Sequence, residues 1–182
     1  MWFFRHANLS KRRTENFSFI LLSPAGFNSL LEVLVMLKTF SSYSDLDVNS
    51  IMNIYVGSVV PGDWRKEFVF TEDLRLFFQC KDAYLALWSC DGIPVSAVRI
   101  EPYSDGYLLS CLETAPQSRR KGFARSLLQA VMEYCPGTYY AHVDGRNKAS
   151  MALHRSLGFQ VFLDYAVHVD GSVYANSFTF KR

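Results

Sequence analysis

Three consecutive cations followed by a glycine form the segment of this sequence that is best suited to bind an anion. Arg119, Arg120 and Lys121 precede Gly122, and a predicted amphipathic helix follows. The first amides of a helix have no intrahelical acceptor, and the positive end of the helix dipole lies in the same turn. Cations placed there destabilise a helix by about 0.3–1 kcal/mol each. A bound anion explains the pattern, and a solvated basic helix start is the alternative.

The small residues of this segment indicate that the anion is a phosphate group. Gly122 lacks a β-carbon, so phosphate oxygens can approach the backbone closely, and Phe123 and Ala124 carry the next free amides. Two other phosphate loops are disfavoured, because the sequence has neither Gly-Lys-Ser/Thr nor Gly-x-Gly-x-x-Gly. We therefore predict a pyrophosphate site at residues 119–124, which we call the basic loop.

Two blocks of the sequence resemble the motifs of one family. Residues 112–124 resemble the acetyl-CoA motif of the GNAT superfamily of N-acetyltransferases, which has the pattern Arg/Gln-x-x-Gly-x-Gly/Ala. The residues that match this pattern are Arg119, Gly122 and Ala124. Residues 147–159 resemble the family's Asn-x-x-Ala-x-x-Leu-Tyr-x-x-x-Gly-Phe motif. The blocks stand in the expected order, and the resemblance spans roughly residues 45–180.

The resemblance implies that acetyl-CoA is a cosubstrate and that no metal is needed. Its acetyl group would move directly, in a ternary complex, to a primary amine of a small molecule, an amino acid or a peptide. The residues implied to contact the cofactor are Leu112, Glu113, Thr114, Arg119, Arg120, Lys121, Gly122, Phe123, Ala124, Asn147 and Ser150. The alternative is a non-catalytic module that binds or senses acyl-CoA, because the basic loop alone would suffice for binding.

Two carboxylates are candidates for the base that takes the ammonium proton of the amine. Glu113 is the first, because in the family the strand that it occupies carries a bulge beside the pantetheine and separates from the next parallel strand. Glu101, at the end of the previous strand, is the second. Glu113 could instead be an outward-facing strand carboxylate.

His154 is the candidate acid for the leaving thiolate, at a position where the family usually has a tyrosine. Asn147, Ser150 and His154 are spaced i, i+3 and i+7, so they share one helical face. The predicted core face consists of Ala149, Leu153 and Leu157. An imidazolium can donate a proton near neutral pH. A structural histidine and a cofactor contact without proton transfer are the alternatives.

The elements that must position these residues follow the order of an α/β protein. A strand, a helix, a strand and a helix around the basic loop predict a parallel pair joined by a crossover. With the family resemblance, we expect a GNAT-like mixed, mostly antiparallel central sheet with a splayed parallel pair and helices on both faces. Strands are predicted at 17–22, 84–88, 95–100, 107–114, 138–143, 160–169 and 173–180, and helices at 29–38, 48–59, 71–80, after the basic loop, and at 148–157.

Composition limits the remaining possibilities. The 182 residues, of which 49% are hydrophobic, suffice for one core, and a net charge of +2 gives no reason to expect nucleic acid or a membrane as partner. Four cysteines without metal-ligand spacing favour a reduced, cytoplasmic protein. We predict an N-terminal extension at residues 1–45, packed on or beside the core, and a GNAT acetyltransferase domain at 46–182. The many aromatic residues could also form a homodimer surface.

Overall fold

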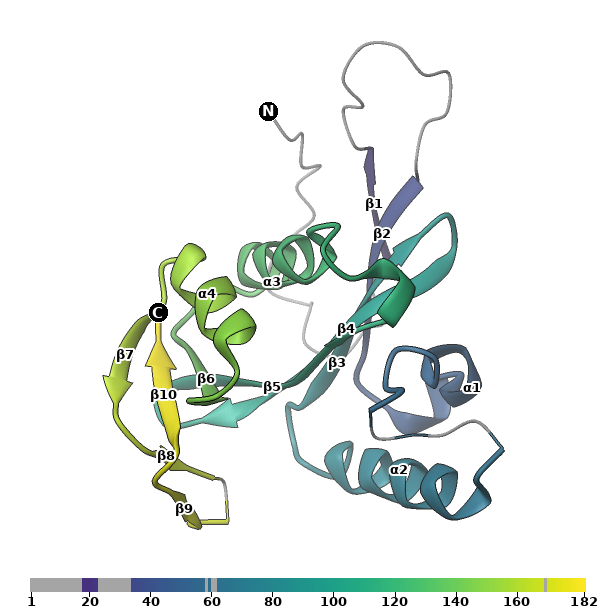
Figure 1. Cartoon of the computed structure of the whole chain (residues 1–182). Coiled ribbons are helices and arrows are strands. Elements are labelled where there is room, and N and C mark those ends of the chain that lie inside the picture. Colours follow the sequence, from purple (N-terminus) through teal and green to yellow (C-terminus); the bar gives the residue numbers. More distant parts are fainter. Residues whose placement is uncertain (1–17, 23–33, 58, 60–61, 169) are drawn as a thin grey trace.

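A single eight-stranded sheet organises the chain (Figure 1). The computed structural model describes residues 18–22, 34–57, 59, 62–168 and 170–182. The strand order is β1-β2-β3-β4-β5-β6-β10-β7, and every pair except β5 and β6 is antiparallel. The sheet strands are β1 (Ser18–Leu22), β2 (Leu34–Phe40), β3 (Tyr84–Cys90), β4 (Ile93–Tyr103), β5 (Gly106–Thr114), β6 (Tyr139–Asp144), β7 (Gln160–Leu163) and β10 (Ser177–Lys181).

Helices cover both faces of this sheet, as the sequence predicted. They are α1 (Val48–Ile51), α2 (Trp64–Phe77), α3 (Phe123–Tyr134) and α4 (Lys148–Ser156), with short 3-10 turns at Tyr43–Asp45 and Pro116–Ser118. Alternate residues of each strand point to opposite faces. Ala86 and Trp88 belong to the core beneath α3 and α4, whereas Leu85 and Leu87 belong to the core beneath α1 and α2. We call these the α3 face and the α2 face.

A β-bulge distorts β5 just before the basic loop. Ala97 of β4 pairs with Glu113 and Arg99 pairs with Ser110, so β5 has one residue more than β4 in this interval. Cys111, within the bulge, has a φ of 49°, which is unusual for a residue with a side chain. A bulge of this kind bends the strand and interrupts its pairing.

The parallel pair is splayed, as predicted. Pairing between β5 and β6 joins residues 107–109 of β5 to residues 139–141 of β6 and ends there. The remainder of β5, from Ser110 to Thr114, is bonded to β4 alone among the described strands. The edge of β5 that faces β6 is therefore free to bind an extended ligand beside residues 112–114.

The N-terminal predictions are partly wrong. A strand at 17–22 is confirmed as β1, with Phe17 outside the described residues, but the helix predicted at 29–38 is wrong from residue 34 onward. Residues 34–40 form β2, which pairs with β3 through residues 35–40. Leu37 and Thr39 are buried while their neighbours are half-buried, which is the two-residue period of a strand. Residues 29–33 lie outside the described part.

Two helix boundaries also differ from the sequence prediction. Among the described residues of the helix predicted at 48–59, only 48–51 are helical. The buried Ile54 stands in a turn and the buried Tyr55 in a segment without regular structure. The next helix begins at Trp64 rather than at Thr71, because the Asp63 side chain accepts hydrogen bonds from the amides of residues 65 and 66. It ends at Phe77, near the predicted end.

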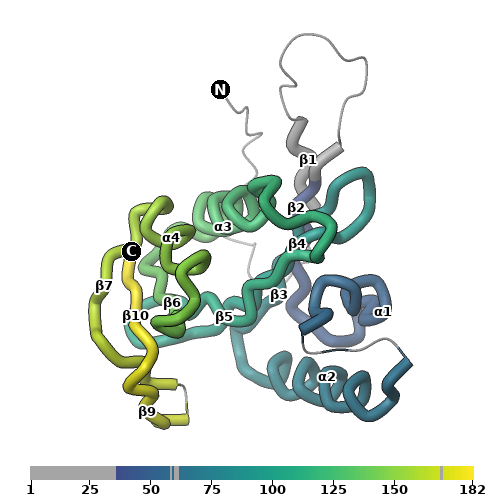
Figure 2. Tube along the Cα trace, in the orientation of Figure 1, coloured from purple at the N-terminus to yellow at the C-terminus, as the bar shows by residue number. Residues whose placement is uncertain are grey.

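The C-terminal hairpin consists of shorter strands than predicted. Residues 160–169 and 173–180 supply four short strands, of which β8 (Ala166–Val167) pairs with β9 (Val173–Tyr174) across the predicted turn. β10 lies between β6 and β7 (Figure 2). The three-stranded meander, α3, β6 and α4 are confirmed within one or two residues at most ends. No helix in the described part of the chain has the length and hydropathy needed to cross a membrane.

Candidate active site

The start of α3 is the one helix start among the described α-helices that has no side-chain cap. Asp47, Asp63 and Asn147 cap the other three helices. The cap residue of α3 is Gly122, in the left-handed conformation with φ 86° and ψ −1°. A β-carbon built on this glycine would meet no atom within 4 Å. The first-turn amides of α3 thus border open space, as an anion site requires.

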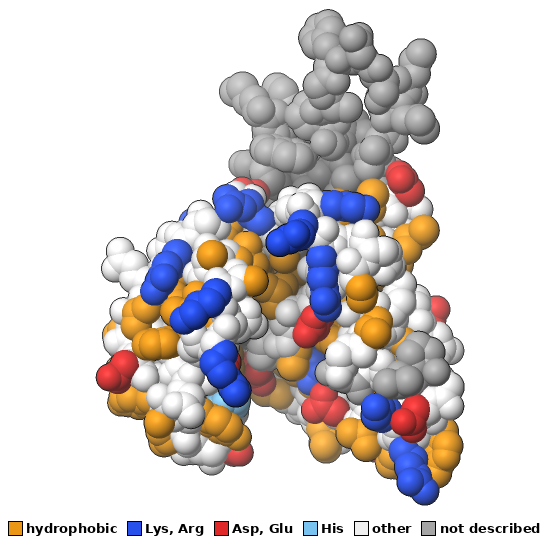
Figure 3. Space-filling model, in the orientation of Figure 1, with side chains coloured by type: hydrophobic (Ala, Val, Ile, Leu, Met, Phe, Trp, Pro, Cys, Tyr) orange, Lys and Arg blue, Asp and Glu red, His pale blue; other side chains and the backbone are white. Residues whose placement is uncertain are grey.

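The cations of the basic loop surround this helix start. Arg119, Arg120 and Lys121 are all exposed, and Arg120 has a left-handed φ of 63°. Figure 3 shows Lys and Arg side chains gathered over the region of the β5–α3 connection. Left-handed residues alternating with other conformations turn successive backbone N–H groups toward one side, which favours anion binding.

Arg119 connects the basic loop to the end of β5. Its Nε donates to the carbonyl oxygen of Thr114 at 3.0 Å, and its guanidinium lies 3.7 Å from Glu113 Oε2. The Thr114 hydroxyl is 2.9 Å from that of Ser96. The structure therefore brings together three of the predicted site residues, namely Glu113, Thr114 and Arg119.

The surroundings of Glu113 shift the pKa of its carboxyl group. Its side chain is half-buried. Burial raises the pKa of this carboxyl, and the neighbouring charge of Arg119 partly opposes the shift. By strand alternation Glu113 faces α1 and α2 together with its partner Ala97, whereas Leu112 packs against the core of the α3 face. The second candidate, Glu101, accepts a hydrogen bond from Ser110 Oγ at 2.9 Å.

The predicted residues on α4 also lie together, but His154 is buried rather than directed to solvent. Asn147 Oδ1 caps the helix by accepting from the Ser150 amide at 3.0 Å. His154 is 3% exposed and packs against the rings of Phe159 and Phe180. The predicted core face is wrong in part, because Ala149 is exposed while His154 is buried.

The contacts of His154 weigh against a role as proton donor. Its Nδ1 lies 2.9 Å from the carbonyl oxygen of Ser150, which can only accept, so Nδ1 carries the hydrogen. Nε2 is buried without a hydrogen-bond partner. Burial lowers the pKa of the ring, which keeps it neutral near pH 7 with no proton on Nε2. The acid role remains a prediction to be tested.

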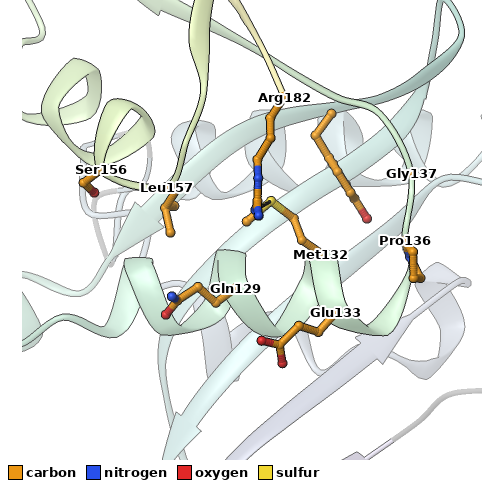
Figure 4. Close-up of a pocket in the computed structure, with 9 residues that line it drawn as sticks. Gln129, Met132, Glu133, Pro136, Gly137, Ser156, Leu157 and Arg182 are labelled. Atoms are coloured by element: carbon orange, nitrogen blue, oxygen red, sulfur yellow. Dashed lines mark hydrogen bonds between the residues drawn. The ribbon is translucent and has the colours of Figure 1, made fainter.

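A separate cavity of about 400 Å³ lies at the other end of α3 (Figure 4). Gln129, Met132 and Glu133 line it from the C-terminal half of that helix, and Arg182 extends into it. None of its lining residues belongs to the predicted site. Among the described residues there is also no group of three or more His, Cys, Asp or Glu side chains that could hold a metal ion.

Arg99 is a buried cation near the predicted site, and its position in the sequence had not singled it out. It is 6% exposed, lies opposite the bulge of β5 and shares the α2 face with Glu113. Its signal in the sequence was a lone cation inside the otherwise apolar and small run of residues 95–100. Charged side chains are rarely fully buried unless they are paired or used.

Comparison with protein families decides what kind of protein this is. Residues 49–159, well over half of the chain, match the model of the Acetyltransferase (GNAT) family. The chain belongs to the GNAT acetyltransferase family. It is therefore an acyltransferase, and the predicted family and enzyme class are confirmed. Comparison with curated proteins finds no match.

Solved structures of acetyltransferases share this fold. PaiA N-acetyltransferase from Thermoplasma acidophilum, in complex with coenzyme A, superposes with a TM-score of 0.55 at 13% identity, over 80% of this chain and 98% of that one. The ribosomal-protein-S18-alanine N-acetyltransferase from Escherichia coli gives 0.55 at 20% identity, over 80% and 92%. A GNAT-family acetyltransferase from Bacillus cereus gives 0.56 at 18% identity, over 81% and 96%. At these identities the likeness establishes the fold alone.

Proposed function

We propose that this protein transfers the acetyl group of acetyl-CoA directly, in a ternary complex, to a primary amine of a small molecule, an amino acid or a peptide. The observation that carries the proposal is the start of α3, where an uncapped helix with Gly122 in a left-handed conformation adjoins three exposed cations. The complex of PaiA with coenzyme A supports the same donor.

The basic loop and the free edge of β5 would hold the donor. The amides of residues 122–124 and the side chains of Arg119, Arg120 and Lys121 can bind a pyrophosphate through charge-assisted hydrogen bonds. The unpaired edge at residues 112–114 can bind pantetheine amides as an added strand would. Asn147 and Ser150, at the start of α4, would complete the contacts. Acetyl-CoA supplies a thioester, which is an activated acyl group.

Glu113 is the base in this proposal. A primary amine reaches the thioester as an ammonium ion and must lose a proton before its nitrogen can attack. The raised pKa of Glu113 makes its carboxylate a stronger proton acceptor than an exposed one, and the neighbouring charge of Arg119 favours its ionised form. The proton passes from the ammonium to Glu113, directly or through one water.

The leaving group does not require a strong acid. A thiol has a pKa near 8.5, so a thiolate can leave at neutral pH and take its proton from water. His154→Phe separates the alternatives. If His154 donates the proton, this change lowers turnover far more than it weakens acetyl-CoA binding, and if His154 is structural, it lowers stability and leaves the turnover of folded protein nearly unchanged.

The remaining expectations are also proposals. We place the division between an N-terminal extension and the GNAT domain near residue 45, although β1 and β2 continue the same sheet. A cytoplasmic location agrees with Cys80, Cys90, Cys111 and Cys135, which are all free thiols. A homodimer would be detected by light scattering of the purified protein.

Isothermal titration with acetyl-CoA and with free CoA, followed by thiol release against a panel of amines, tests the proposed function. We expect micromolar binding of both and thiol release with some amines. Glu113→Gln should reduce thiol release by about 10²–10⁴-fold and leave binding unchanged, because it removes the carboxylate base and keeps the backbone edge of residues 112–114 that would hold pantetheine. Binding without thiol release for any amine would instead favour an acyl-CoA sensor.

A further inference from the structure

Two buried hydrogen-bond donors on the α2 face have no partner. Tyr55 is 3% exposed and Arg99 is 6% exposed, yet neither Tyr55 Oη nor Arg99 Nε has a hydrogen-bond partner. Buried polar groups in folded proteins are nearly always hydrogen-bonded, so each such exception needs an explanation. Both groups are donors, since guanidinium N–H can only donate and a neutral phenol donates its hydrogen.

These two donors belong to one cluster beside the proposed reaction centre. Tyr55 follows α1, and Arg99 stands in β4 opposite the bulge that separates Ser110 from Glu113. Burial raises the pKa of Tyr55. The positive charge of Arg99 lowers this pKa, and the negative charge of Glu113 raises it. Tyr55 and Phe77 belong to the same core on the α2 face, and the guanidinium of Arg99 lies 5.2 Å from the Phe77 ring, so both donors face one region.

Arg99 has one ionic partner and retains binding capacity. Its Nη2 donates to Asp73 Oδ2 at 2.6 Å, and its guanidinium lies 5.2 Å from the ring of Phe77. The Asp73 side chain is 58% exposed, so its carboxylate lies on the solvent side of the guanidinium and accepts from Nη2. An arginine fork presents five N–H groups and can bind a second carboxylate.

We propose that Arg99 and Tyr55 bind a carboxylate of the acceptor, so that the acceptor is a free amino acid or another amine with a carboxylate a few bonds away. This inference rests on the proposed acetyl transfer. Within the acceptor, the ammonium group lies toward Glu113 and the carboxylate accepts from Arg99 Nε and Tyr55 Oη. A single zwitterionic acceptor thereby places its ammonium group at Glu113 and its carboxylate at the two unpaired donors, Arg99 Nε and Tyr55 Oη.

The solvent side of the cluster provides the route of entry. Cys111 and Asp73 are exposed, and Glu113 is half-buried. Figure 3 shows the molecular surface hollowed between the part formed by α1 and α2 and the part formed by α4 and the C-terminal strands. The carboxylate enters from this side, where Arg99 Nη2 already donates to the exposed side chain of Asp73.

Matched pairs of acceptors test this inference. Each of the twenty standard amino acids is compared with the amine that its decarboxylation would give. Two quantities are measured for each pair: kcat/KM for acetylation, and the Kd for binding to the protein saturated with free CoA. We expect the preferred amino acid to have a kcat/KM about 100-fold or more higher, and a Kd about 100-fold or more lower, than its decarboxylated amine, because each hydrogen bond to a charged group contributes a factor of about ten or more.

Tyr55→Phe is the sharpest variant, because it removes only the unpaired oxygen. It should lower the ratio of kcat/KM for the amino acid to kcat/KM for its decarboxylated amine about tenfold, and it should leave the Kd of acetyl-CoA unchanged. Arg99→Lys should lower the same ratio further. Tyr84→Phe, which alters a buried phenol packed against the α3 face, is the matched control and should leave the ratio unchanged.

Two results would overturn the inference. One is equal or better binding and turnover of the decarboxylated amines, as an acceptor recognised through a neutral peptide carbonyl would give. The other is an unchanged ratio in Tyr55→Phe. Failure of the proposed function looks different, because then acetyl-CoA does not bind or no amine releases thiol. The Kd comparison still decides the inference in that case, and it is made on the protein without CoA if CoA does not bind.

Discussion

Gly122→Ala separates the contribution of the basic loop to folding from its contribution to binding. The new methyl group meets no atom within 4 Å, so it causes no clash in the free protein. The φ of 86° is nevertheless unfavourable for alanine, and the strain should lower the free energy of unfolding by about 1–2 kcal/mol. For a chain of this length the melting temperature should fall by roughly 2–8 °C.

Binding of acetyl-CoA should suffer more than folding does in this variant. The methyl group fills the space through which a pyrophosphate oxygen approaches the first-turn amides, and each charge-assisted hydrogen bond lost contributes about 1.5–3 kcal/mol. The Kd should therefore rise about 10–100-fold in isothermal titration. Gly171→Ala is the control, because Gly171 has a φ of 83° and equally open surroundings in the β8–β9 turn. Equal Kd values for the two variants would refute the reasoning.

Three further predictions follow from the titrating groups and the buried phenol. Activity should fall at low pH as Glu113 becomes protonated, and Arg119→Ala should move that limb of the pH–kcat/KM profile to higher pH, because it removes the charge that lowers the pKa of Glu113. Tyr55→Phe should leave the free energy of unfolding in urea unchanged or raise it by up to about 1 kcal/mol, and a clear loss would mean that the hydroxyl has a partner. Burial lowers the pKa of His154 and that of His142, the latter from 6.5 to about 4. The unfolded chain then binds protons that the folded chain does not, so stability is full above pH 6.5 and is lost as pH falls toward 4, and His142→Phe should reduce this loss in urea titrations at pH 7 and pH 5.

The central part of the fold could be predicted because its signals are local. Three strands separated by short turns, a glycine before an amphipathic helix and a capped α4 each occupy contiguous residues, and the structure has them where the patterns indicated. The splayed pair could be anticipated through the family resemblance, and the bulge at Cys111 gives its physical cause.

The strand β2 and the start of α2 could not be predicted, because tertiary contacts decide them. Residues 34–37 have apolar side chains compatible with a helix, but β2 is selected by its pairing with β3. In α2, Trp64, Phe68 and Val69 are exposed, so the apolar pattern does not mark the buried face and the true start at Asp63 is obscured.

The sequence indicated which residues belong to the candidate site, but it did not indicate how their side chains are arranged. Arg119, Glu113 and Thr114 do lie together, and Asn147 and Ser150 lie at one helix start. Helical spacing placed His154 beside them, but spacing alone could not reveal that the ring packs between Phe159 and Phe180. Arg99 became recognisable only when its burial and its position opposite the bulge were known.

The most direct test of the central claim is mass spectrometry of an amine panel after incubation with the protein and acetyl-CoA, with free thiol measured in the same samples. We predict at least one acetylated amine, formed in equal amount with free CoA, and loss of both products in Glu113→Gln. Acetyl-CoA that binds to the protein and remains intact in the presence of every amine would contradict an acetyltransferase.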